Sequence, residues 1–193
     1  MFIFTGCARS GTPYIAELLE RSNFDIGNEV FVGSSGISSW MLTSKSSIEP
    51  HNGPIPSSMW TGTERRIHLV RDPIACINSI QTLTCWEYID KELGFDKDQH
   101  LLLKSMLFWA RWNKMAEYEK MIKIEDFDYD AYVELCEYIN IAPNKEAFDE
   151  IPTFDSNEPN PHSCYDAETM RRWYPQAFDE ICITAYKLGI EVK

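Results

Sequence analysis

Short apolar runs in this chain alternate with segments in which apolar residues recur at helical spacing. The first apolar run lies close to the N-terminus. Residues Phe2 to Thr5 predict a buried strand, because strands of a covered parallel sheet appear as continuous apolar runs. A stretch of small residues follows, and a helix is predicted from Thr12 to Ser22. The first 22 residues therefore predict a strand, a loop and a helix.

Strands and helices continue to alternate along the rest of the chain. The predicted strands are 24–27, 66–71 and 121–124, and the predicted helices are 98–119, 129–139 and 177–188. Asp72 and Pro73 are suited to begin a further helix, as the cap and the first helical residue. The alternation predicts a three-layer α/β fold: a central, mainly parallel sheet with helices on both faces, in a P-loop-like nucleotide-binding architecture. We expect a single domain over residues 1–193, with ligands at the carboxyl ends of the strands.

Three segments lack a strand or helix pattern. Residues Ser46–Thr63 carry three prolines and two glycines, which predicts a surface loop. The Pro/Asn-rich residues Ile151–Ser163 are long enough to form a lid or a substrate loop. The Gly/Ser-rich residues Val32–Ser39 are expected to lead into a short helical piece at Trp40–Leu42.

Composition and charge narrow the class of protein. A chain of 193 residues with 44% apolar residues can bury a globular core. It has neither an apolar run near the roughly 18 residues of a membrane span nor a signal peptide, so we expect a cytoplasmic protein. The six cysteines form no C-x-x-C pair and are expected to be reduced, packed thiols. The net charge of -12 argues against a nucleic acid as the main partner.

The stretch Gly6-Cys-Ala-Arg-Ser-Gly-Thr12 has the composition of an anion-binding loop. Small residues let backbone N–H groups approach an anion, and the helix that begins at Pro13 points its positive end toward it. Arg9 adds a permanent charge, while Ser10 and Thr12 add hydroxyl donors. A nucleotide-triphosphatase loop would have Lys after its last glycine, where this chain has Thr12. An ordinary strand-to-helix turn capped by Thr12 is the alternative interpretation.

A second stretch, residues 67–79, carries a cation and a hydroxyl at related positions. Arg71 lies at the carboxyl end of a predicted strand, and Ser79 lies about two helical turns further on. If this strand neighbours the first one, the pair predicts a second anion site apart from the first. In the alternative interpretation Arg71 pairs with a carboxylate such as Asp72, and Ser79 is a buried helix serine.

Together the two stretches resemble the PAPS-dependent sulfotransferase family, and in particular its small bacterial-type members. The resemblance is carried by an Arg-Ser-Gly-Thr loop at 9–12 after the first strand and by Arg-Asp-Pro at 71–73, with Ser79 downstream. Further similar segments are Glu29 after the second strand, 36–40, 108–113, 122–127 and the C-terminal Leu188-Gly-Ile. The similarity covers nearly the whole chain and is weakest at 44–63 and 151–163.

The resemblance implies transfer of a sulfuryl group from 3′-phosphoadenosine-5′-phosphosulfate (PAPS) to a hydroxyl or amine of a small-molecule or carbohydrate acceptor. The product nucleotide is then 3′-phosphoadenosine-5′-phosphate (PAP), and no metal is implied. The implied cofactor-binding residues are Arg9, Ser10, Gly11, Thr12 and Pro13 around the 5′-phosphosulfate, and Arg71 and Ser79 at the 3′-phosphate. Arg9 stands where many members have Lys, so its implied catalytic role is charge stabilisation rather than proton donation.

Glu29 is the first candidate for the general base that the acceptor needs. It follows the second predicted strand, and the family commonly uses Glu or His in this role. An exposed loop carboxylate or a helix cap is the alternative interpretation of Glu29. His51 and His162 are further candidates, because they lie in the two long loops, whereas His68 is expected to be packed within a strand.

Two other functions stay open at this point. One is a small P-loop nucleotide kinase or triphosphatase, and the other is a non-catalytic module that binds an anionic nucleotide. The missing Lys and the lack of an apolar strand ending in a plain Asp for magnesium count against the first. The sequence also leaves the acceptor open among sugar, lipid, phenol, peptide and small alcohol.

Overall fold

The computed structural model describes residues 1–29, 32–43, 62–151 and 164–192. In chain order its elements are β1 (Phe2–Gly6), α1 (Thr12–Arg21), β2 (Ile26–Asn28), β3 (Gly36–Ser38), η1 (Trp40–Leu42), β4 (Arg65–Val70), α2 (Pro73–Ile80), α3 (Trp86–Leu93), α4 (Leu101–Met115), β5 (Lys120–Lys123), η4 (Ile124–Asp126), α5 (Tyr129–Ile139), α6 (Lys145–Glu150), α7 (Ala167–Trp173) and α8 (Pro175–Lys187). Helices separate β1 from β2 and β4 from β5, as the hydrophobic pattern predicted, whereas no described helix lies between β2 and β3, and α5 to α8 follow the last described strand.

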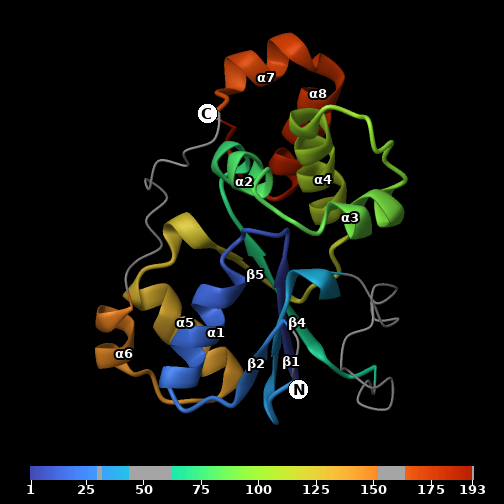
Figure 1. The fold of residues 1–193 in the computed structure, drawn as a ribbon. Coiled ribbons are helices and arrows are strands. Elements are labelled where there is room, and N and C mark those ends of the chain that lie inside the picture. Colours follow the sequence, from blue (N-terminus) through green and yellow to red (C-terminus); the bar gives the residue numbers. More distant parts are fainter. Residues whose placement is uncertain (30–31, 44–61, 152–163, 193) are drawn as a thin grey trace. The chain divides into compact units, whose positions relative to one another are not determined.

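The strands form one five-stranded sheet in the order β2-β3-β1-β4-β5, and every neighbouring pair is parallel (Figure 1). Ile3 of β1 lies opposite Ile37 on one side and Arg66 on the other. Since the chain continues to both sides of β1, the carboxyl end of this strand is a topological switch point, where ligands bind in open α/β sheets. With helices around this sheet, the structure confirms the predicted α/β class and is consistent with a three-layer arrangement.

Contacts divide the chain into two compact units, each built from several segments. The first unit comprises 1–6, 10–70 and 116–155 and contains the whole sheet with α1, α5 and α6. The second comprises 7–9, 71–115 and 156–193 and contains α2, α3, α4, α7 and α8. The single domain over residues 1–193 stays a prediction.

The core of the first unit lies on one face of the sheet. Strand side chains alternate between faces, so Phe4 and Ile3 point to opposite sides of β1. Phe4 belongs to the large cluster in which strand residues pack with α1 and α5, the helices drawn along this face in Figure 1. Ile3 belongs to a smaller cluster with Ile37 and Leu42 on the other face. The larger cluster fixes α1 and, with it, Gly11 at the N-terminus of this helix.

The second unit is built around α4, which packs against α8 and α2. Most of the middle of α4 is buried, including its polar residues Lys104, Ser105 and Asn113. Its buried Lys104 forms an ion pair with Asp90 of α3, with 2.7 Å between Nζ and Oδ1. This pairing offsets part of the cost of burying a charge.

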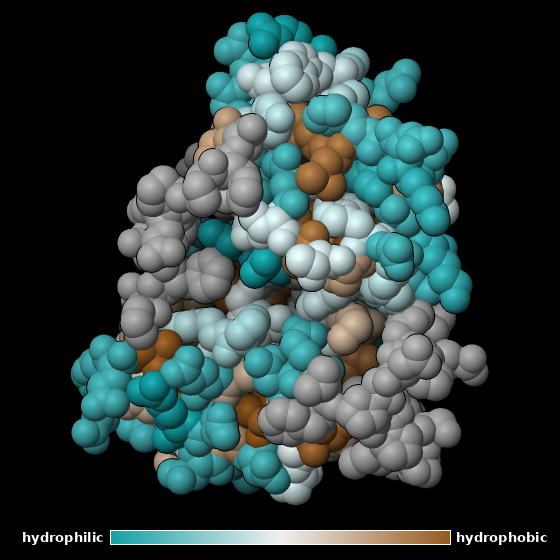
Figure 2. Space-filling view, in the orientation of Figure 1, coloured by the Kyte–Doolittle hydropathy of each residue, from teal (hydrophilic) through white to brown (hydrophobic). Residues whose placement is uncertain are grey.

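Hydrophilic residues cover most of the described surface on the face shown in Figure 2, and hydrophobic residues appear there in small separate areas. No helix in the described ranges is long and apolar enough to span a membrane.

The prediction was wrong about some elements and their lengths. The helix predicted at 98–119 is shorter, and β3, α3, α6 and α7 were not predicted. Strand β3 has only three residues within a Gly/Ser-rich stretch, so no alternation is visible in the sequence. It forms because parallel pairing with β1 and β2 satisfies its backbone.

Candidate functional site

Two glycines shape the loop between β1 and α1. A Cβ atom at Gly6 would lie 2.4 Å from the carbonyl oxygen of Leu69, so the chain passes β4 too closely for a side chain. Gly11 is the N-cap of α1 and has a φ of 89°, in the left-handed region. The loop therefore leads tightly into the N-terminus of α1, where the first N–H groups have no partner within the helix and favour an anion.

The residues around this loop in the first unit confirm the predicted start of the helix. Pro13 occupies the first turn of α1, as predicted, and is exposed. Ser10 and Thr12 are buried. Thr12 is a residue of α1 rather than its cap, which is Gly11. The alternative interpretation of a turn capped by Thr12 is therefore wrong in its capping residue.

Glu29 lies next to the end of the loop. The Thr12 hydroxyl donates to Oε1 of Glu29 at 3.3 Å, and the Ser39 hydroxyl donates to Oε2 at 2.8 Å. The backbone N–H of Trp40 also donates to this carboxylate. Glu29 directly follows β2, and Ser39 directly follows β3, so neighbouring parallel strands bring the two side chains together.

Burial and hydrogen bonding act in opposite directions on the Glu29 carboxyl. Burial raises its pKa, because the charged form loses solvation, whereas the donors from Ser39, Thr12 and Trp40 lower it. Burial is the larger effect, so the pKa of Glu29 is raised above its ordinary value. A carboxyl with a raised pKa accepts a proton more readily, which suits a general base near neutral pH.

Backbone strain coincides with the predicted catalytic residues. Among the described residues other than glycine, positive φ values occur at Arg9, Asn23, Glu29 and Asn140. Asn tolerates the left-handed region, and Asn140 is the C-cap of α5. Arg9 and Glu29, with φ values of 71° and 55°, have no such local reason. Strain of this kind is concentrated at functional sites, where the surrounding structure maintains it.

The second unit places the two predicted arginines next to each other. Nη1 of Arg71 donates to the carbonyl oxygen of Arg9 at 3.3 Å. The exposed side chain of Arg9 donates through Nη2 to the Thr82 hydroxyl at 2.9 Å. The Thr82 hydroxyl in turn donates to the carbonyl oxygen of Ser79 at 2.8 Å. Arg9, Arg71 and the end of α2 that carries Ser79 therefore form one local cluster.

Helix α2 is anchored on the loop and on its own cap. The Asp72 side chain accepts from the N–H of Ala75 at 2.8 Å, and Pro73 stands in the first turn, which confirms both predictions. The buried Cys76 thiol donates to the carbonyl oxygen of Ala8 at 3.3 Å. Because Ala8 precedes Arg9, this contact helps to fix the backbone that carries the exposed cation.

Two functional candidates were missed from the sequence. Ser39 was missed because β3 was not predicted, so nothing marked this serine as a strand-end residue beside Glu29. Thr82 was missed because its hydrogen bond to Arg9 joins residues 73 positions apart. The pattern of a hydroxyl three residues after Ser79 is the only local signal for it.

The histidine predictions have different outcomes. His68 is fully buried and stacks on Tyr118 with ring centroids 5.1 Å apart, which confirms that it is packed within a strand. His51 and His162 lie outside the described residues, as do most of the predicted loop 46–63 and of the predicted lid 151–163.

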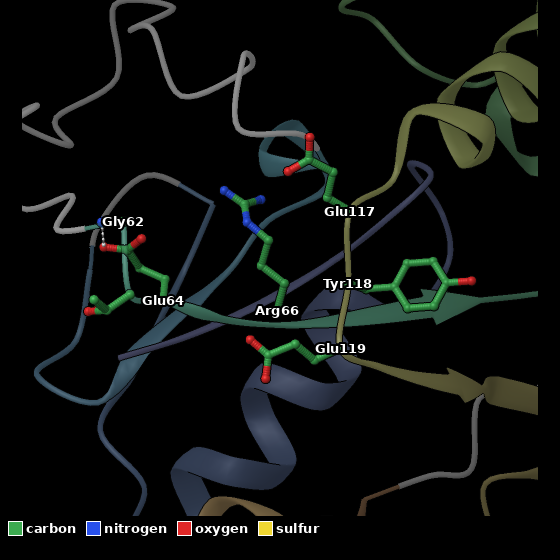
Figure 3. A pocket seen from close by; sticks show the side chains of 7 residues that line it. Gly62, Glu64, Arg66, Glu117, Tyr118 and Glu119 are labelled. Atoms are coloured by element: carbon green, nitrogen blue, oxygen red, sulfur yellow. Dashed lines mark hydrogen bonds between the residues drawn. The ribbon is translucent and has the colours of Figure 1, made fainter.

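A cavity of about 280 Å³ lies at the amino ends of β4 and β5, within the first unit (Figure 3). Its lining residues are Gly62, Thr63, Glu64, Arg66, Glu117, Tyr118 and Glu119. Arg66 is buried, and its Nη1 donates to the carbonyl oxygen of Leu42 at 2.7 Å. The charges of Glu64 and Glu117 act favourably on this guanidinium. The carboxylates make the cavity unsuited to a polyanionic nucleotide.

The arrangement supports anion binding and proton transfer. In the first unit, the N-terminus of α1 and the hydroxyls of Ser10 and Thr12 are groups that can hold a phosphate or sulfate, and in the second unit the neighbouring Arg9 and Arg71 are such groups. Glu29 supplies a partly desolvated carboxylate beside Thr12.

Comparison of the chain with family models, curated proteins and solved structures gave no match.

Proposed function

We propose that this protein is a PAPS-dependent sulfotransferase that acts on a hydroxyl or amine of a small-molecule or carbohydrate acceptor, and that it works in the cytoplasm. The observation that carries the proposal is the contact between Arg71 and the backbone of Arg9. The loop and the strand end that resemble the two anion-binding stretches of the family are 62 residues apart in sequence and meet at hydrogen-bond distance.

The residues present fit the two charged ends of PAPS. Arg9, Ser10, Gly11, Thr12 and Pro13 would hold the 5′-phosphosulfate, and Arg71 and Ser79 the 3′-phosphate. When bound, PAPS supplies the sulfuryl group that is transferred. The arginines would provide permanent positive charge in a protein of net charge -12, which makes local cations the main source of attraction for the nucleotide.

Arg9 is suited to stabilise charge rather than to move a proton. Its guanidinium stays protonated at any physiological pH and presents several donors in one plane. Its Nη2 donates to the Thr82 hydroxyl at 2.9 Å, which orients one edge of the guanidinium. Such preorganised donors stabilise the charge that develops in the transition state of a group transfer.

Glu29 is suited to accept the proton of the acceptor. Its carboxylate is partly desolvated and is held by three donors, so its direction is fixed. The Thr12 hydroxyl links it to the loop proposed to bind the sulfated end of the cofactor. General-base assistance of this kind contributes about 10²–10⁴-fold to a rate.

Ligand-induced stabilisation tests the proposal and separates it from the two other functions. PAP without metal should raise the free energy of unfolding of the wild-type protein by about 2.7 kcal/mol at a hundredfold excess over its Kd. Arg71→Ala should lose most of this effect. Stabilisation by ATP with magnesium but not by PAP would refute the proposal in favour of a kinase or triphosphatase. PAP binding without sulfuryl transfer to a broad acceptor panel would favour a non-catalytic module.

A further inference from the structure

Ser39 is a buried partner of the Glu29 side chain whose backbone is held by the sheet. It follows β3 in an extended conformation, with φ and ψ of -157° and 130°, and only 1% of it is exposed. Its N–H donates to the carbonyl oxygen of Phe4 in β1 at 2.8 Å. Its backbone is therefore held by the central strand of the sheet.

The direction of the Ser39 hydroxyl hydrogen follows from its two contacts. The hydroxyl oxygen accepts from the N–H of Met41 at 3.3 Å, where it caps η1. A serine hydroxyl has one hydrogen and two acceptor lone pairs, so the hydrogen stays available for donation. It points to Oε2 of Glu29 at 2.8 Å, the shorter of the two hydroxyl contacts to this carboxylate.

Thr12 is the second side-chain partner of Glu29, with a longer contact than that of Ser39. Its hydroxyl also has only one hydrogen, and its contact with Oε1 is 3.3 Å long. Thr12 belongs to the loop proposed to bind the sulfated end of PAPS. If its hydrogen turns to that anion, Ser39 remains the side-chain donor that holds the carboxylate.

We propose that Ser39 is the positioning residue of the base: its hydroxyl holds the Glu29 carboxylate in one orientation and stabilises the ionised form. This inference rests on the proposed function, in which Glu29 accepts the proton of the acceptor. Ser39 touches neither the cofactor nor the acceptor in this scheme and acts through Glu29 alone.

The titration of Glu29 is the measurement that distinguishes this role from a structural one. Besides burial, three donors determine the pKa of Glu29: the hydroxyls of Ser39 and Thr12 and the N–H of Trp40. The Ser39 hydroxyl lowers this pKa, so Ser39→Ala should raise it further. Carboxyl ¹³C NMR of glutamate-labelled protein follows the titration without an acceptor, and Glu29→Gln assigns the signal.

Ser39→Thr and Ser22→Ala are the matched variants. Ser39→Thr keeps a hydroxyl and should titrate like wild type. Ser22 is also a buried serine of the first unit, and its hydroxyl donates to the carbonyl oxygen of Leu18 at 2.7 Å. Ser22→Ala should lower stability and leave the Glu29 titration unchanged.

Transfer kinetics give the second readout. The acid limb of the kcat/KM profile should move to higher pH in Ser39→Ala, with about tenfold or greater loss on that limb and recovery at higher pH. An unchanged Glu29 titration in Ser39→Ala, or a Ser39→Thr variant that titrates like Ser39→Ala, would overturn the inference. PAP binding is measured separately on each variant. Failure of wild type to bind PAP refutes the proposed function, whereas a shifted titration still supports the role of Ser39 toward Glu29.

Discussion

The two ends of the sheet in the first unit use similar residue types for different purposes. At the carboxyl ends, Glu29 is held by hydroxyl and N–H donors beside a glycine-shaped loop. At the amino ends, Glu64, Glu117 and Glu119 line an open cavity, and two of them face the buried Arg66. The carboxylate of Glu29 is partly desolvated and its backbone has a positive φ, whereas Glu117 and Glu119 at the other end are exposed.

The difference shows why residue type alone does not identify a site. Parallel strands direct their carboxyl ends to the switch point, where the helix N-terminus and loop amides gather. At the amino ends of β4 and β5, carboxylates lie near two arginines, Arg65 and Arg66, and the N–H of Gly62 donates to Oε1 of Glu64. Glu29, a single partly desolvated carboxylate among hydrogen-bond donors, is suited to accept a proton. The exposed glutamates at the amino ends are instead solvated by water.

The sharpest way to break this comparison is to remove the charge of one glutamate at each end. Glu29→Gln should lower sulfuryl transfer by about 10²–10⁴-fold, because the acceptor loses its base. Its affinity for PAP should stay near the wild-type value. Initial rates with saturating PAPS and calorimetric titration with PAP measure the two quantities. Glu117→Gln is the control at the amino end, and an equal loss of rate there would contradict the assignment.

The second test compares Arg71, which directly follows β4, with Arg66 inside this strand; both are buried, with 5% and 4% exposure. Arg71→Ala should weaken PAP binding by about 10–100-fold, since a charge-assisted contact to phosphate is lost. Arg66→Ala should instead lower the free energy of unfolding by about 1–3 kcal/mol, because the Leu42 carbonyl loses its donor. Denaturant titration measures the stability of both variants, and PAP titration measures their affinity for the nucleotide. A weaker PAP affinity in Arg66→Ala alone would show that Arg66, and not Arg71, contacts the phosphate.

Two glycines with positive φ allow the same comparison at the level of the backbone. Gly11→Ala should cost about 1–2 kcal/mol of stability from the left-handed conformation, and more because its Cβ would lie 3.1 Å from Cδ1 of Ile124. PAP affinity should fall as well, because the loop must shift. Gly62 has a φ of 77°, and no atom lies within 4 Å of the Cβ that alanine would add. Gly62→Ala should therefore lose only the stability that the left-handed backbone conformation costs. PAP affinity that is unchanged in Gly11→Ala would remove the loop from the proposed site.

The smallest effect concerns pH. The pKa of Glu29 is raised in the folded protein, so ionisation of this carboxyl costs folding free energy, and stability is lost as the pH rises through its folded pKa. Glu29→Gln does not ionise there, so its stability relative to wild type should increase between about pH 4 and pH 7. Chemical denaturation of both proteins across this range measures the difference. A relative stability that falls with pH would mean that the pKa is lowered instead.

The sequence predicted the part of the site that is continuous in the chain. The left-handed conformation at Gly11 and the proline at 13 follow from local backbone chemistry, whereas the need for glycine at position 6 comes from its close approach to Leu69 of β4. Arg71 and the cap at Asp72 follow from the same kind of local signal. The alternation of apolar runs with helical spacing was likewise enough to predict a parallel α/β sheet.

Partners that are distant in sequence were decided by the tertiary structure. Ser39 reaches Glu29 only because β3 pairs with β2, and β3 is a three-residue strand whose own sequence favours no strand. The contact of Arg71 with Arg9 and that of Arg9 with Thr82 join residues more than 60 positions apart. Local patterns determine backbone conformation and which residues are available, whereas strand pairing and helix packing determine which of them meet.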